Sequence, residues 1–296
     1  MKVLIITGGN SSERNISLTS AKNVRKALLN LNYKSKTYDL KNGYQPLRKL
    51  AKNFDVLFPI LHGEEGEGGK LHKFLNELKT PVVGTRNFKG MQKGWYKIPF
   101  KKYCDKNKIL TSRWKIIKSK RDILKFGLPC VLKASNGGSS REVFIIKNEN
   151  DIKKPACLKI LRSSANLFVE DYLPGVEATV GILNGKALPV LEIIPPKNHW
   201  FSYKYKYSGA TKEIPNAPDL DNKTKQNLQK IALKIHKFFD LGTYSRIDFI
   251  VYQNKPYVLE LNTIPGLTEG SLFPKIAKST GIENFEEFIR VLVESA

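Results

Sequence analysis

Cysteine is scarce in this chain, with only Cys104, Cys130 and Cys157 among 296 residues. They lie too far apart for a zinc motif and are odd in number, so the simplest account is reduced thiols in a cytoplasmic protein. Long apolar runs are also missing. The run Val3–Ile6 is too short for a signal peptide, and no run approaches the roughly 20 residues that span a membrane. We therefore expect no membrane segment.

Acidic residues are few: 27 Asp and Glu stand against 50 Lys and Arg, which gives a net charge of +23. Such an excess is typical of proteins that bind nucleic acid or another anionic surface. Arginine, which suits bidentate phosphate contacts best, accounts for only 10 of the 50, and no basic tail or RNA-binding motif is present. We therefore expect solvated lysine-rich faces and no nucleic-acid partner, with a nucleic-acid surface as the alternative. The charge also favours an anionic substrate such as a nucleotide.

The chain is long enough, and at 41% apolar residues hydrophobic enough, for two or three domains. Residues 1–86 alternate between strand and helix patterns, which predicts a parallel, Rossmann-like α/β sheet. Residues 87–172 predict a smaller α+β unit that begins with one helix over Lys89–Asn107. Residues 173–296 predict further strands, an irregular aromatic stretch over Pro195–Pro218, a helix over Asn222–Phe239 and a hairpin. The other expected strands are Val3–Thr7, Tyr33–Leu40, Asp55–Leu61, Arg113–Lys118, Cys130–Ala134, Val143–Ile146, Asn166–Glu170, Glu177–Leu183 and Ala187–Ile194.

The segment Arg246–Asn262 has two alternating flanks rich in β-branched and aromatic residues, which predicts a hairpin. If its loop is the three residues Gln253–Lys255, Asp248 faces Glu260 and Arg246 faces Asn262. Like charges directly opposite on a sheet are destabilising, whereas two carboxylates and an amide suit a hard cation such as Mg²⁺. The alternative is a solvated face with an Arg–carboxylate pair. The other face is expected to enter the core through Ile247, Phe249, Val251, Tyr257, Leu259 and Leu261.

Four further motifs each have a functional and a plainer interpretation. Lys133 precedes the glycine-serine turn Asn136–Ser140, and this turn either binds phosphate or is an ordinary β-turn. Glu170–Glu177 offers backbone groups to an adenine and a carboxylate to a ribose, or is an exposed linker. Trp200–Tyr207 is a lid over an anionic site, or an amphipathic strand. After the turn at Pro265-Gly266, Ser271 binds a carboxylate, caps a helix, or does both.

These motifs, in this order, resemble the D-alanine–D-alanine ligase family of the ATP-grasp superfamily over nearly the whole chain. The resemblance is carried by the segments Gly8–Ala21, His62–Glu67, Arg246–Asp248 and Glu260–Leu272. It implies a three-domain ATP-grasp architecture, with domains at residues 1–86, 87–172 and 173–296. It also implies a cytoplasmic homodimer that uses ATP to join two D-alanines through an acyl phosphate, for peptidoglycan precursor synthesis. Tyr207 favours a dipeptide over an ester product.

The resemblance further implies a role for each site residue. For ATP, Lys97, Lys133 and Lys206 contact the phosphates, Glu170 and Leu173 the adenine, and Glu177 the ribose. Two Mg²⁺ ions, replaceable by Mn²⁺, are held by Asp248, Glu260 and Asn262. Glu13, linked to Ser139 and Tyr207, holds the first D-alanine, and His62 lies beside its carboxylate. Arg246 and the Gly266 N–H form an oxyanion site, and Ser271 with Leu272 binds the second substrate.

Several positions depart from the family pattern. Ala134 replaces a proline and Glu142 a glycine beside the phosphate turn, while Gly68, His72 and Lys73 replace other residues in the second motif. The segment before Lys97 lacks the family's small residues, which makes Lys97 the least secure ATP ligand. These departures leave open two alternatives: a divergent ligase that joins other amino acids, and an ATP-binding homologue that has lost catalysis.

Overall fold

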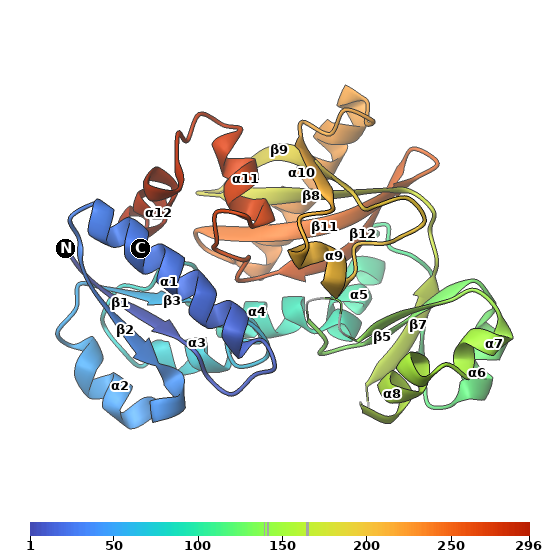
Figure 1. Ribbon diagram of the computed structural model, residues 1–296, viewed down its shortest axis with the longest axis horizontal. Coiled ribbons are helices and arrows are strands. Elements are labelled where there is room, and N and C mark those ends of the chain that lie inside the picture. Colours follow the sequence, from blue (N-terminus) through green and yellow to red (C-terminus); the bar gives the residue numbers. More distant parts are fainter. Residues whose placement is uncertain (139, 141, 164–165) are drawn as a thin grey trace.

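Three β-sheets organise the chain in a computed structural model that describes residues 1–138, 140, 142–163 and 166–296 (Figure 1). The first sheet is parallel, in the order β2-β1-β3. The second and third are antiparallel, in the orders β4-β7-β5-β6 and β10-β9-β8-β11-β12. The fold is therefore mixed α/β and α+β, as the sequence predicts.

The predicted strands lie close to their observed ranges, and residues 212–215, in the stretch predicted to be irregular, form a further strand. They are β1 (Lys2–Thr7), β2 (Lys34–Asp39), β3 (Val56–Pro59), β4 (Trp114–Ile117), β5 (Cys130–Ala134), β6 (Val143–Ile146), β7 (Leu167–Asp171), β8 (Val176–Leu183), β9 (Lys186–Ile194), β10 (Lys212–Pro215), β11 (Tyr244–Tyr252) and β12 (Lys255–Asn262). The helices are α1 (Arg14–Asn30), α2 (Tyr44–Ala51), α3 (Lys70–Leu75), α4 (Phe88–Trp95), α5 (Lys97–Lys106), α6 (Lys120–Phe126), α7 (Glu149–Ile152), α8 (Pro155–Ser163), α9 (Tyr203–Tyr207), α10 (Asn222–Phe239), α11 (Leu272–Lys278) and α12 (Phe285–Glu294), with a 3₁₀ turn at Leu40–Asn42. Among the described residues, no helix is both long and apolar enough to cross a bilayer.

The strand β1 is buried on both faces, which explains its uninterrupted apolar run. Val3 and Ile5 pack in the same core as α1, while Leu4 and Ile6 pack in a second core with α2 and α3. The sheet is therefore covered by helices on both sides, and its strands end at one edge in the loops that follow β1 and β3.

The C-terminal helices join the first sheet to the third. Helix α12 lies beside α1, red against blue in Figure 1, and residues of α11 and α12 share one core with α1 and β9. Asn30 Nδ2 donates to Glu286 Oε1 at 2.8 Å, and the Tyr33 hydroxyl donates to Glu294 Oε1 at 2.8 Å. This packing holds the loops of the first sheet at the side of the third sheet.

The single helix predicted over Lys89–Asn107 is wrong, because the chain breaks at Tyr96 into α4 and α5. Tyr96 has extended backbone angles, φ −68° and ψ 118°. Pro99 then falls in the first turn of α5, where a helix tolerates the missing N–H. The Lys97 N–H instead donates to the Ser135 carbonyl at 2.9 Å. The break therefore ties the start of α5 to the end of β5 and brings Lys97 to the space between the sheets.

Sensitivity to acid is expected from His72 of α3, which is buried and whose Nδ1 has no hydrogen-bond partner among the described residues. Burial lowers its pKa from 6.5 to about 4, with a hydrogen bond to Gly66 opposing. The unfolded chain therefore binds a proton below pH 6.5 that the folded chain binds only near pH 4. The contribution of neutral His72 to the free energy of unfolding is full above pH 6.5. Between pH 6.5 and about pH 4 it falls by about 1.4 kcal/mol per pH unit.

We expect His72→Gln to flatten the dependence of unfolding free energy on pH between 6.5 and 4. Urea denaturation at a series of pH values measures this slope. His199→Gln, at an exposed position, is the control and leaves the slope at its wild-type value. Equal slopes for wild type and His72→Gln would contradict this assignment.

Candidate active site

The hairpin of β11 and β12 brings Asp248 opposite Glu260, and Arg246 opposite Asn262, as predicted. The predicted three-residue loop is wrong. The loop is the pair Gln253-Asn254, whose φ angles of 50° and 60° fit a type I′ turn. The register shifts by one between Asp248 and Phe249, because β12 carries an extra residue there, a β-bulge. The two-residue turn moves the register by one residue and the bulge moves it back, so Asp248 still faces Glu260.

The bulge also decides which side chains enter the core. Phe249 pairs with Val258, which is fully buried, and Leu261 is buried as predicted. Leu259 and Tyr257 are only partly buried, so their predicted place in the core is wrong. Leu259 instead lines the cleft on the acidic side of the hairpin.

The two facing carboxylates are both held in their charged form. Asp248 accepts from Arg246 Nε and Nη2, each at 2.9 Å, from Thr179 Oγ1 at 2.6 Å and from Asn262 Nδ2 at 2.9 Å. Burial raises its pKa, but Arg246 outweighs burial and the pKa is lowered. For Glu260, burial is likewise outweighed, by Lys97 first, and its pKa falls far below the usual range.

A solvated outer face is excluded by this geometry, since Asp248 is only 6% exposed and both acids line one cleft. Among the described residues no group of three or more His, Cys, Asp and Glu side chains forms a metal centre. Mg²⁺ commonly takes one or two carboxylates and completes its shell with phosphate oxygens and water. Two ionised carboxylates beside an amide therefore fit a hard cation that arrives with an anionic ligand.

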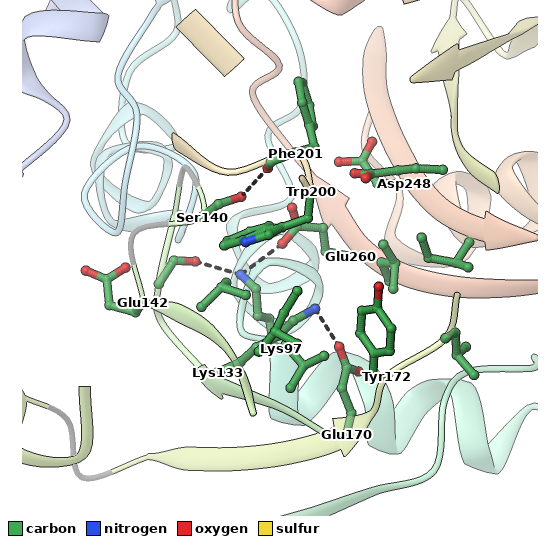
Figure 2. Close-up of a pocket in the computed structure, with 18 of the residues that line it drawn as sticks. Lys97, Lys133, Ser140, Glu142, Glu170, Tyr172, Trp200, Phe201, Asp248 and Glu260 are labelled. Carbon is green, nitrogen blue, oxygen red and sulfur yellow. Dashed lines mark hydrogen bonds and ion pairs between the residues drawn. The ribbon is translucent and has the colours of Figure 1, made fainter. Parts of the chain in front are cut away.

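The cleft lies between β5 and β6 on one side and the third sheet on the other. Lysines gather on one part of its wall (Figure 2): Lys97 Nζ lies 3.1 Å from Glu260 Oε2 and donates to the Gly137 carbonyl at 2.6 Å, and Lys133 Nζ lies 2.5 Å from Glu170 Oε1. The apolar part of the wall is formed by Val131, Val143, Ile145, Leu173, Ile250 and Leu259. The cleft thus combines an apolar slot with a cationic end beside two acids.

Glu170 and Glu177, the two acids expected near the base and the sugar of a nucleotide, both line this cleft. The carboxylate of Glu170 is occupied by lysines, which leaves only its backbone for a base. Burial raises the pKa of Glu177 to about 8, with Lys206 and Lys133 opposing and Asp248 and Glu260 adding to the rise. Glu177 therefore carries a proton near neutral pH and can donate as well as accept a hydrogen bond.

The aromatic stretch that precedes β10 covers the cleft. Trp200, Phe201 and Lys206 line it, and Lys206 Nζ lies 5.0 Å from the centre of the Phe201 ring. Ser140 Oγ donates to the Phe201 carbonyl at 3.3 Å, so the glycine-serine turn touches this segment across the cleft (Figure 2). Tyr203–Tyr207 is the helix α9, so the strand interpretation of this stretch is wrong. Ser139 and the side chain of Tyr207 lie outside the described part of the chain.

A second group of predicted residues meets beside the glycine-serine turn. Glu13 is buried at the start of α1, and a Cβ placed on Gly138 would lie 2.5 Å from Glu13 Oε2, so Glu13 abuts the glycine-serine turn. The His62 N–H donates to Ser17 Oγ at 2.9 Å. Burial lowers the pKa of the His62 ring, with Glu13 opposing and Arg246 adding, which places this ring in the field of both side chains.

Ser271 and Gly266 lie together after the hairpin. A Cβ on Gly266 would lie 2.9 Å from Ser271 Oγ. Ser271 stands at the N-cap of α11, but its side chain makes no capping bond, and instead accepts from the Thr268 N–H at 3.2 Å. A purely capping role for Ser271 is therefore wrong, and its hydroxyl faces the Gly266 turn. Leu272, the first residue of α11, is buried behind it.

Comparison with known proteins agrees with this geometry. Residues 97–294 match the sequence family described as D-ala D-ala ligase C-terminus. The chain belongs to the D-alanine–D-alanine ligase family. It is 34% identical to the D-alanine–D-alanine ligase of Maridesulfovibrio salexigens, over 99% of this chain and 98% of the relative, and 36% identical to that of Aquifex aeolicus, over 99% and 100%. The solved structure of D-alanine–D-alanine ligase from Bacillus anthracis complexed with ATP is similar, with a TM-score of 0.83 and 27% identity over 100% of this chain and 97% of that one.

Most departures from the ligase pattern lie away from the cleft. A Cβ on Gly68 would lie 2.4 Å from the Glu64 carbonyl, so this backbone has no room for the family's larger residue. His72 is buried in α3, and Lys73 is exposed beside it. Ala134 and Glu142 are the exceptions, because both line the cleft, and Glu142 also lies close to Gly137.

Sequence reasoning missed two buried groups at the ligase site. Glu67 accepts from the Gly63 N–H at 2.8 Å, and burial, with Glu13 adding, raises its pKa to about 8. Its place in the motif His62–Glu67 was the available signal. Lys101 pairs with Glu170 inside the protein. The available signal was its position four residues after Lys97, because side chains at that spacing share one face of a helix.

Proposed function

We propose that this chain joins two molecules of D-alanine into a dipeptide at the expense of ATP, and so supplies a precursor of peptidoglycan. One observation carries the proposal: two ionised carboxylates, Asp248 and Glu260, face each other in a cleft whose wall also presents Lys97, Lys133 and Lys206. The ligases that this chain resembles, one of them solved in complex with ATP, support the choice of substrate and nucleotide.

The residues suit the chemistry that the reaction needs. A carboxylate is a poor acyl donor, so one oxygen of the first D-alanine carboxylate attacks the γ-phosphorus of ATP, ADP leaves, and an acyl phosphate forms. The amine of the second D-alanine then attacks the carbonyl carbon, and phosphate leaves with the original carboxylate oxygen. Charge neutralisation and positioning dominate phosphoryl transfer, and Lys97, Lys133 and Lys206 provide both.

Beside the glycine-serine turn, Glu13 holds the ammonium group of the first D-alanine, with Ser139, Tyr207 and His62 around the same substrate. Arg246 and the Gly266 N–H stabilise the oxyanion of the tetrahedral intermediate, for which each donor contributes about 3 kcal/mol. Ser271 and Leu272 receive the second D-alanine. The hydroxyl of Ser271, turned away from its own helix, supports this role.

Asp248, Glu260 and Asn262 hold magnesium, and we expect two ions, with Mn²⁺ as a substitute. Bound magnesium neutralises charge that develops on the phosphate oxygens. Rotation of the Asn262 amide presents its oxygen in place of the nitrogen that now donates to Asp248. In the apolar slot, Leu173 and the backbone of Glu170 contact the adenine, and Glu177 contacts the ribose.

We also infer domains at residues 1–86, 87–172 and 173–296, and a homodimer in the cytoplasm. The three separate sheets support the division of the chain. Sedimentation equilibrium measures the oligomeric state, and a single species of 33.6 kDa would contradict the dimer.

The proposed function is tested with a panel of D- and L-amino acids, ATP and Mg²⁺, by following phosphate release and identifying products by mass. We expect phosphate release that depends on D-alanine, with D-alanyl-D-alanine as the product. Release with another amino acid would identify a divergent ligase. ATP binding without turnover for any amino acid would identify a homologue that has lost catalysis, and either result would overturn the proposal.

A smaller effect is expected from Gly138→Ala. The new Cβ would displace the Glu13 carboxylate, which lies 2.5 Å from its position. We expect KM for D-alanine to rise about tenfold while KM for ATP stays near its wild-type value, since small displacements of positioning groups are costly. Steady-state kinetics measure both constants. Gly270→Ala, where a Cβ meets nothing within 4 Å, is the control, and equal KM values for both variants would contradict the contact.

A further inference from the structure

A charged cluster lies behind the wall of the cleft. Lys101 of α5 is 1% exposed and does not line the cleft, yet its ammonium group pairs with Glu170 Oε2. The other oxygen of the same carboxylate, Oε1, lies 2.5 Å from Lys133 Nζ, which does reach the cleft. One carboxylate is therefore shared between a hidden lysine and a lysine of the nucleotide site.

The hydrogen bonds around Lys101 fix its charge. Lys101 Nζ lies 2.7 Å from Thr111 Oγ1 and 2.9 Å from Ser112 Oγ. The Thr111 hydroxyl donates its own hydrogen to the Val258 carbonyl at 2.8 Å, and the Ser112 hydroxyl donates its hydrogen to Glu170 Oε2 at 2.7 Å. Both hydroxyls must accept from Lys101, and Glu170 accepts a third hydrogen. Only an ammonium group has three hydrogens to give, so Lys101 is charged although burial works against its charge.

The balance of charge then follows. Burial opposes ionisation of Glu170, but Lys101 and Lys133 outweigh it and lower its pKa to about 2, so the carboxylate is ionised. The cluster of Lys101, Glu170 and Lys133 carries a net charge of +1. Without Lys101, Glu170 would cancel Lys133, and the wall of the cleft would present a neutral ion pair to an anion. Interactions inside a protein are weakly screened, so one buried unit charge is felt at the cleft.

We infer that Lys101 is a positioning residue for the nucleotide: it holds the far oxygen of Glu170 and offsets its charge, so that Lys133 acts on the polyphosphate as an uncompensated cation. This inference rests on the proposed function, because it takes the nucleotide phosphates to lie beside Lys133. In this inference the side chain of Glu170 holds the two lysines, independently of any contact between its backbone and the adenine.

The test measures dissociation constants for ATP, ADP, AMP and adenosine by calorimetry at fixed Mg²⁺ concentration. Lys101→Met keeps the length of the side chain and removes its charge. We expect about tenfold weaker binding of ATP, a smaller loss for ADP and AMP, and a change of less than about twofold for adenosine, since the lost interaction is with charge. Lys102→Met, an exposed neighbour on α5, is the control and leaves all four constants unchanged.

A second variant separates charge from structure. Lys101→Met combined with Glu170→Gln removes one charge of each sign and returns the cluster to +1, so ATP binding is expected within about threefold of wild type. If the single variant does not fold, the double variant carries the test by the same criterion.

Three outcomes would overturn the inference: an equal loss for adenosine and ATP, no loss in the single variant, or no recovery in the double variant. A wild-type protein that binds no ATP would instead remove the proposed function itself, which keeps the two failures distinct.

Discussion

Glutamine in place of Glu260 is expected to lower kcat for D-alanine-dependent phosphate release by about a thousandfold or more. Glu260 is the acid that faces Asp248 across the hairpin, and three lysines of the cleft hold it ionised. The amide cannot supply the charge that a hard cation and its phosphate ligands require. Metal ions contribute several kcal/mol to a transition state of this kind, and each 1.4 kcal/mol is about tenfold in rate.

The control for this variant is Glu77→Gln. Glu77 also pairs with a cation, Arg48, but this pair is exposed, so we expect unchanged kinetics. Measurement of kcat over a range of Mg²⁺ concentrations completes the test. A Glu260→Gln enzyme that keeps more than a tenth of the wild-type rate at saturating Mg²⁺ would contradict the role of this carboxylate.

Methionine in place of Arg246 is expected to lower kcat by a few hundredfold and to destabilise the fold by about 3 kcal/mol. Two effects coincide at this position. In the proposed mechanism the guanidinium is a donor for the oxyanion, and loss of one such donor typically costs a hundredfold to a thousandfold. It also makes two bonds of 2.9 Å to Asp248, and removal of one partner leaves the other as a buried, poorly compensated charge.

Arg113→Met provides a matched control, because Arg113 also donates hydrogen bonds to an aspartate, Asp171, through two nitrogens. The Arg113 side chain is 64% exposed, so this pair contributes about 1 kcal/mol or less. Urea denaturation and steady-state kinetics measured on both variants compare the two sites. Equal losses for Arg246→Met and Arg113→Met would contradict a special role for the buried pair.

The sequence predicts the strands well because their signals are local. Helix α10 has its predicted bounds, and so do β5 and β6, since periodicity and turn residues mark their ends. The facing of Asp248 and Glu260 was predicted correctly from a loop of the wrong length, because the bulge at Leu259 compensates for the tighter turn. A bulge depends on packing against the neighbouring strand, and alternation along one strand does not reveal it.

The errors arise where tertiary contacts decide. Tyr96 leaves the helix because the Lys97 N–H finds a partner in Ser135 of another element. The aromatic stretch forms α9 where it lies over the cleft, whereas its sequence left a lid and an amphipathic strand equally open. Lys101 looks in the sequence like one of many solvated lysines, and only the convergence of α5 and β7 shows that it is buried. Charge clusters that are assembled from distant segments are therefore the part of the site that is hardest to predict from a single sequence.

The central claim is that this cleft activates a carboxyl group by phosphoryl transfer, and the fate of one oxygen atom tests it most directly. D-alanine labelled with ¹⁸O in its carboxylate is incubated with the enzyme, ATP and Mg²⁺, and the released phosphate is examined by mass spectrometry. The account predicts that each phosphate carries one oxygen from D-alanine, because the carboxylate oxygen attacks the γ-phosphorus and departs with it. Phosphate that carries no label while dipeptide accumulates would contradict the acyl phosphate and the proposed roles of Asp248 and Glu260.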